Sequence, residues 1–234
     1  MTRKLWSPTR VVAVVVIGCW AGLFWFLWLG GRSALFVGPR TAWVVPAGAV
    51  ILTVAAVGRL VSARVDHIDA VRRTEVSTAI LLLLPVAVTL ALPPTALGSF
   101  AATRRSSFAG GELAPSVKEI LNGDLTFQTV GGARSPEARA ALRERTGEPL
   151  TLEGFVTHLD DAPADGFTLS RFVITCCVAD ALAVHVPVEG DDSMLEDDDW
   201  VRVSGTLMAH HGPVVLHADA VVPIERPDHP YLRQ

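Results

Sequence analysis

Three long apolar segments without charged residues dominate the first hundred positions of this chain. They cover residues 11–29, 43–57 and 76–97. A hydrocarbon core about 30 Å thick is crossed by roughly 20 helical residues, so each segment is long enough, with its flanks, to span a bilayer. The whole chain is 50% apolar and has a mean hydropathy of +0.39. We therefore predict three transmembrane helices, at about 11–29, 43–61 and 76–97, within a membrane region of residues 1–102.

The first segment has an alternative interpretation as a cleaved signal peptide, because Arg3, Lys4 and Arg10 precede it. Its apolar run is longer than a signal core, and no small-x-small cleavage motif appears before Arg32. These features favour an uncleaved anchor.

Prolines mark the third segment, which contains Pro85 and ends at Pro93-Pro94. A proline disfavours helical backbone in the residue before it. The third helix is therefore expected to close near Leu92.

Lysine and arginine in the flanks predict the orientation, because cytoplasmic loops carry an excess of these residues. Seven lie on the side of the N-terminus: Arg3, Lys4, Arg10, Arg59, Arg64, Arg72 and Arg73. Four lie on the opposite side: Arg32, Arg40, Arg104 and Arg105. We expect a multi-pass protein of the cytoplasmic membrane with a cytoplasmic N-terminus and an extracytoplasmic C-terminal domain.

The part that follows the apolar segments is acidic. From Arg104 onward it holds 11 Lys and Arg against 21 Asp and Glu, a net charge of −10. Such a surface repels nucleic acid phosphates. The chain also lacks a Walker loop, a G-x-S-x-G and an H-E-x-x-H sequence. These absences argue against nucleic acid binding and against the common hydrolases, and we expect a protein that is not an enzyme.

This acidic part divides into a connecting region, 103–149, and a β domain, 150–234. Residues 103–111 are rich in Ser and Gly and indicate a linker, and residues 116–121 indicate one helical turn. Ser135-Pro136-Glu137 is a typical helix start, and Gly147 follows the expected end. Alternating apolar residues then predict five strands, at 150–158, 167–175, 181–188, 200–207 and 214–222. Five short strands favour an OB-like Greek-key barrel, with a single open sheet as the alternative.

Two adjacent cysteines, Cys176 and Cys177, stand between the second and third expected strands. Neighbouring Cα atoms are about 3.8 Å apart, below the usual disulfide range of about 4.4–6.8 Å, so a bridge between them would be strained. In a regular strand their side chains would also point to opposite faces. They converge only if the backbone turns, for which Val178-Ala179-Asp180 is the candidate.

Three interpretations of these cysteines stay open. One cysteine is buried and the other incidental, as is common for this residue type. Alternatively, one or both thiolates bind zinc or copper with Asp180 and a histidine, for which His158 and His185 are the candidates. The absence of a C-x-x-C spacing weighs against a metal site. The third interpretation is a redox or thiol-transfer role.

Other polar clusters carry less information. His210-His211 is expected in a solvated hairpin loop. The acidic run of residues 189–200 lacks the D-x-D-x-D-G spacing of a calcium loop and indicates a solvated connection.

At these residues the chain resembles the DUF1980 family of permease subunits. The most specific part of the resemblance is "RFVITCCVADA", residues 171–181, which includes Arg171, Phe172, Cys176, Cys177 and Ala179. Three further stretches also match: Gly154-Phe155-Val156, Trp200-Val201 with Val203 and Gly205, and Pro227 to Tyr231. It implies a bacterial integral membrane protein beside a polytopic permease of the DUF318 (UPF0718) type, related to organoarsenical exporters, and a link to zinc supply. The histidine-rich loop of the family is represented here by His67 with Asp66 and Asp69.

The resemblance and the residues together favour a non-enzymatic accessory subunit. Its helices would pack against the permease, and its outer barrel would bind or hand over a metal ion or small solute. The alternative is a membrane-tethered thiol redox or metal-binding protein that acts without a permease. A purely structural scaffold is the third hypothesis.

Overall fold

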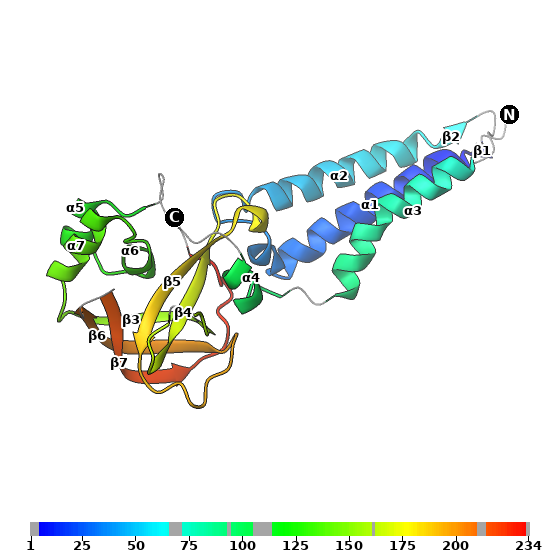
Figure 1. The fold of residues 1–234 in the computed structure, drawn as a ribbon. Helices are drawn as coiled ribbons and strands as arrows, with labels where there is room; N and C mark the ends of the chain where they lie inside the picture. The colour runs from blue at the N-terminus through cyan, green and yellow to red at the C-terminus, as the bar shows by residue number, and fades with distance from the viewer. Residues whose placement is uncertain are drawn as a thin grey trace. The chain divides into compact units, whose positions relative to one another are not determined.

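The fold is that of a computed structural model. It describes residues 5–65, 72–92, 95–104, 114–160, 162–209 and 214–232. The chain separates into two compact units, Met1–Thr95 and Ala96–Gln234, which we describe one at a time (Figure 1).

The first unit consists of long apolar helices, as the sequence predicted. These are α1 (Pro8–Leu29), α2 (Val44–Val61) and α3 (Arg73–Ala91). Each of the three is long and apolar enough to cross a membrane. At 1.5 Å per residue they measure about 27 to 33 Å, close to the thickness of a hydrocarbon core. Many apolar side chains point outward from α2 and α3, as in Ile51, Val54 and Leu81.

Hydrogen bonds tie α1 to its two neighbours. The indole of Trp25 donates to the hydroxyl of Thr53 on α2 at 3.1 Å, and the indole of Trp20 donates to the carbonyl of Leu82 on α3 at 3.1 Å. An indole N–H in an apolar setting needs such a partner, because no water supplies one. These two bonds therefore fix how α2 and α3 face α1.

Shorter elements join and flank these helices. A 3-10 turn, η1 (Arg32–Leu35), follows α1, and β1 (Leu5–Trp6) pairs with β2 (Arg64–Val65). The end of α3 follows the expected rule, since Leu92 precedes a proline and has extended backbone (φ −96°, ψ 128°). The helix thus closes where it was expected to close, near Leu92. The predicted span, which extended to residue 97, is longer than the helix itself.

The second unit contains a closed β-barrel. Its strands are β3 (Pro149–Thr157), β4 (Gly166–Val173), β5 (Leu182–Glu189), β6 (Trp200–Ala209) and β7 (Val214–Pro223). In the described part of the chain they follow the order β3-β4-β5-β7-β6, and β6 pairs back to β3. All pairings are antiparallel except β5 with β7. The prediction of a five-stranded OB-like barrel is confirmed, and the single open sheet is excluded.

Alternation along the strands builds the interior. Val184, Val186 and Val188 of β5 are fully buried, as are Phe167 and Leu169 of β4. The same core cluster extends to apolar residues of the short helices, so these helices pack on the barrel.

Four short helices precede the barrel in the described part of this unit. They are α4 (Ser99–Arg104), α5 (Val117–Asn122), α6 (Phe127–Gly131) and α7 (Pro136–Glu144). The predicted helix start is correct, because the Ser135 hydroxyl accepts the Ala138 N–H at 3.1 Å. The sequence did not predict α4 or α6. Thr103 and Arg104, which were expected in a linker, end α4, and the rest of that expected linker lies outside the described residues.

Arg145 connects these helices to the barrel. Its guanidinium pairs with Glu148, just before β3, and also donates to the carbonyls of Ile120 and Gly123 at the end of α5. One side chain thus joins α5, the end of α7 and the first strand.

Candidate functional site

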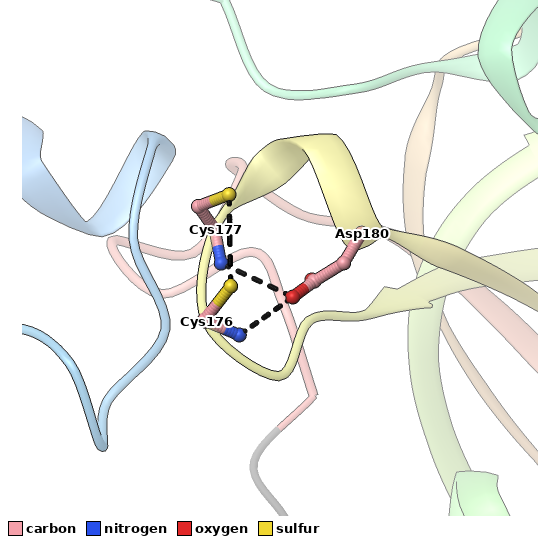
Figure 2. A group of neighbouring side chains, drawn as sticks. All are labelled: Cys176, Cys177 and Asp180. Atoms are coloured by element: carbon pink, nitrogen blue, oxygen red, sulfur yellow. Dashed lines mark hydrogen bonds between the residues drawn. The ribbon is translucent and has the colours of Figure 1, made fainter.

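The two adjacent cysteines lie in the connection between β4 and β5. The last residue pair of this hairpin is Val173 with Leu182, and Ile174 is buried just beyond it. The chain then leaves the sheet, and a 3-10 turn, η2 (Val178–Asp180), brings it back (Figure 2). The turn was expected at these residues, and it removes the strand geometry that would have separated the two side chains.

Asp180 holds the turn through its carboxylate. One oxygen, Oδ1, accepts the Thr175 N–H at 3.0 Å. The other, Oδ2, accepts the N–H groups of Cys176 at 2.8 Å and Cys177 at 3.4 Å. An aspartate at this position therefore satisfies backbone donors that the sheet no longer pairs.

The turn brings both sulfur atoms to the same side. Their Sγ atoms are 3.8 Å apart, with the Cys176 thiol donating to Cys177, and neither forms a disulfide bond in the described part of the chain. Each sulfur and a carboxylate oxygen of Asp180 lie within 4.8 Å of one another. Cys176 is exposed and Cys177 is half-buried, so neither fits the interpretation of a buried core cysteine.

Hydrogen bonding links the protonation of Cys176 to that of Asp180. Hydrogen bonding to Asp180, then to Cys177, raises the pKa of the Cys176 thiol to about 11. Desolvation acts to raise the pKa of Asp180, but hydrogen bonds from the Cys176 thiol and from the three backbone N–H groups outweigh it and lower that pKa. At pH 7 the site thus holds a carboxylate beside a protonated Cys176 thiol, and a metal ion that binds this sulfur must displace its proton.

One comparison with known proteins concerns this part of the chain. The family model described as DUF1980 C-terminal domain matches residues 139–233. This segment is therefore similar to the C-terminal domain of the DUF1980 family. The expected relationship is confirmed over this segment, which contains the barrel and the cysteine turn. A search of curated proteins finds no match to the chain.

The spacing of the sulfurs in the cysteine turn suits a tetrahedral metal ion. Two thiolates that bind one zinc ion at about 2.3 Å each are separated by about 3.8 Å. The Sγ atoms of Cys176 and Cys177 have that separation before any rearrangement. Loss of the Cys176 proton to a metal would also release an acceptor position on Asp180, which the thiol otherwise occupies. The residues therefore fit zinc, and soft thiolates equally suit copper.

The two candidate histidines lie elsewhere in the barrel domain. His158 follows β3, and its Nδ1 lies 2.9 Å from an Asp197 carboxylate oxygen. His185 lies in the middle of β5, where its Nδ1 is 2.9 Å from the Ser170 hydroxyl. Among the described residues, the cluster that could hold a metal contains neither histidine. His67, His210 and His211 lie outside the described residues.

Other residues of the family resemblance pack together at the end of β4, next to the cysteine turn. Phe172 is buried, and its ring stacks on Phe155 with centroids 5.8 Å apart. Trp200 also packs against Phe155, with ring centroids 5.8 Å apart and the rings tilted. Arg171 lies 5.6 Å from the Trp200 ring centroid, and burial lowers its pKa. These residues therefore anchor the strand that leads into the cysteines.

Arg171 and Phe172 also anchor the last residues of the chain. The Arg171 guanidinium donates to the carbonyls of His229 and Pro230, and the Phe172 carbonyl accepts the Leu232 N–H at 2.8 Å. The family motif is thus explained as a structural support for the end of β4.

The remaining two motif residues have different roles. Ala179 is an exposed residue of η2. Gly205 lies at a register shift in β6, where an added Cβ would meet the His217 carbonyl oxygen at 2.0 Å. Only glycine permits that close approach of β7.

Proposed function

We propose that this chain is a non-enzymatic accessory subunit of a membrane permease whose extracytoplasmic barrel binds a soft metal ion and hands it over. The observation that carries the proposal is the group of ligand atoms from Cys176, Cys177 and Asp180, all within 4.8 Å on an exposed turn. Zinc and copper(I) are the ions that this combination of sulfur and oxygen ligands favours.

The number of ligands supports transfer rather than permanent storage. A structural zinc site usually has four protein ligands, whereas this turn supplies three. A tetrahedral ion would keep one position open, and the exposure of Cys176 makes that position accessible to a donor or acceptor. An ion bound in this way can pass to a partner through ligand exchange.

The membrane part supports the assignment to a permease complex. Three apolar helices with outward-facing Ile51, Val54 and Leu81 offer a surface for lipid or for the helices of a partner. The excess of Arg and Lys on the N-terminal side, seven against four, supports a barrel outside the cytoplasm.

A thiol redox role is supported less well. The attacking species in disulfide exchange is a thiolate, and a pKa of about 11 for Cys176 leaves about one thiol in ten thousand ionised at pH 7. Reactive cysteines have lowered pKa values, so the raised pKa of Cys176 makes it a poor nucleophile, whereas a metal ion that binds the sulfur can displace the proton.

Metal titration of the full chain in mild detergent tests the site. We expect zinc and copper(I) to bind one equivalent per chain, and we expect Cys176→Ser and Cys177→Ser each to abolish this binding. Cys19→Ser, which removes the remaining cysteine from α1, is the matched control and should bind as the wild type does. Binding that survives in the Cys176→Ser Cys177→Ser double variant would refute the site.

Two further measurements test the partner and the orientation. Affinity purification from native membranes should recover a multi-helix permease, whereas homogeneous self-assembly would count against an accessory role. A membrane-impermeant thiol reagent should modify Cys176 on intact spheroplasts. Modification only after lysis, even of reduced and unfolded protein, would show that the barrel lies in the cytoplasm.

A further inference from the structure

A pocket of about 590 Å³ lies on the outer face of β4 and β5, where α4, α6 and α7 approach the barrel. Thr168, His185 and Pro187 line it from the two strands. A volume between about 300 and 1,000 Å³ is typical of sites for small molecules. Its lining does not include the cysteine turn.

Two arginines give the pocket a positive lining in an acidic domain. Arg134 follows α6 and Arg139 lies on α7, and within the described residues no Asp or Glu lines the pocket with them. The Arg134 Nε donates to the Gly131 carbonyl at 3.3 Å, which draws the side chain toward the pocket. In the portions of the chain that the structure covers, neither guanidinium has a carboxylate partner. Two uncompensated guanidinium groups on one cavity favour an anion.

The strands that line the pocket contribute polar groups. The Nδ1 atom of His185 is held by the Ser170 hydroxyl at 2.9 Å. Thr168 pairs across the strands with Thr157, whose hydroxyl is buried and has no hydrogen-bond partner among the described residues. Buried hydroxyls usually have a hydrogen-bond partner. The Thr157 hydroxyl, next to Thr168 in the sheet, is therefore a polar group that the described residues leave unused.

The remaining walls are apolar. They include Val130, Leu142, Leu159 and Val214 from four separate segments. We propose that this pocket binds a small organic carboxylate, with the arginines on the carboxylate and the apolar walls around a short hydrocarbon body. The site is independent of the metal site, because the two share no residue.

Saturation-transfer NMR with the full chain in detergent provides the test, with acetate, butanoate, hexanoate and neutral hexanamide as probes. We expect affinity to rise with chain length, by up to about fourfold for each methylene buried. Hexanamide should bind at least about tenfold more weakly than hexanoate, because it cannot form charge-assisted hydrogen bonds with both arginines. Empty micelles serve as the blank.

Variants separate the pocket from unspecific binding. Arg134→Ala and Arg139→Ala should each weaken hexanoate binding about tenfold, and Arg139→Glu should abolish it. Arg143→Ala, an exposed arginine of α7 that does not line the pocket, is the matched control and should bind normally. The Cys176→Ser Cys177→Ser variant should also bind normally, which separates this proposal from the metal site.

Three results would overturn the proposal. They are equal binding of hexanoate and hexanamide, unchanged binding after loss of both arginines, and no binding of any acid at its highest soluble concentration. Unchanged thermal unfolding of each variant shows that a lost signal reflects the pocket. Because these arginines are exposed, we expect every variant to fold.

Discussion

Replacing Asp180 with alanine should release the backbone of the cysteine turn. Its carboxylate accepts three N–H groups, from Thr175, Cys176 and Cys177, and two of these bonds are 3.0 Å or shorter. A hydrogen bond to a charged acceptor contributes about 1.5 to 3 kcal/mol, and the loss of a capping side chain typically costs about 1 kcal/mol. Because water reaches the exposed Thr175 and Cys176, we take the lower end and expect a loss of about 2 kcal/mol.

Amide hydrogen exchange measures this loss where it occurs. In metal-free buffer at pH 7, about 2 kcal/mol corresponds to roughly 30-fold faster exchange at the three amides. Asp180→Asn keeps one acceptor oxygen and should give an intermediate effect. For Asp228→Ala, which removes an exposed carboxylate elsewhere in the domain, we expect no change. Equal exchange at these amides in wild type and Asp180→Ala would refute the idea that Asp180 organises the turn.

Three other predictions concern the supports of the domain. The hydrogen bond from Arg145 lowers the pKa of Glu148. The pair therefore stabilises the fold above the ordinary carboxyl pKa, and this contribution is lost as the pH falls through the lowered value. Glu148→Gln should accordingly lower the melting temperature at pH 7 but not at pH 2. Gly205→Val should cost more than about 3 kcal/mol in urea unfolding, because its Cβ would meet the His217 carbonyl at 2.0 Å. Ser135→Ala should cost about 1 kcal/mol in the same assay, and Ser135→Asp should retain the wild-type value, since aspartate also caps.

The strands and long helices could be predicted because their signals are local. The alternation of Val184, Val186 and Val188 marks β5, and long uncharged runs mark α1 to α3. The short helix α6 was missed, although Thr126 caps it in reciprocal hydrogen bonds with Thr129. Five residues are too few for a periodic apolar pattern, and burial of the helix against the barrel stabilises it instead.

The cysteine turn could be predicted because its signal is also local. Cys176, Cys177 and Asp180 lie within five positions of one another, so a single turn brings them together. His158 and His185 were proposed as further ligands from residue type alone, and their neighbours Asp197 and Ser170 come from other segments of the chain.

The carboxylate pocket gave no signal in the sequence. Arg134 and Arg139 belong to the connecting region, whereas Thr168 and His185 come from two strands of the barrel. Nothing in the local pattern around either arginine indicates that the fold places them beside those strands.

The pairing of Leu232 with Val173 means that the residues around Leu232 support the end of β4. A tag fused there, or a protease that trims the last residues, would loosen the strand that leads into the sulfur atoms. Metal binding lost in a C-terminally tagged preparation would then be mistaken for a property of the ligand residues themselves. An affinity handle inserted at Met194, which is 89% exposed in the acidic loop, would leave that strand anchored.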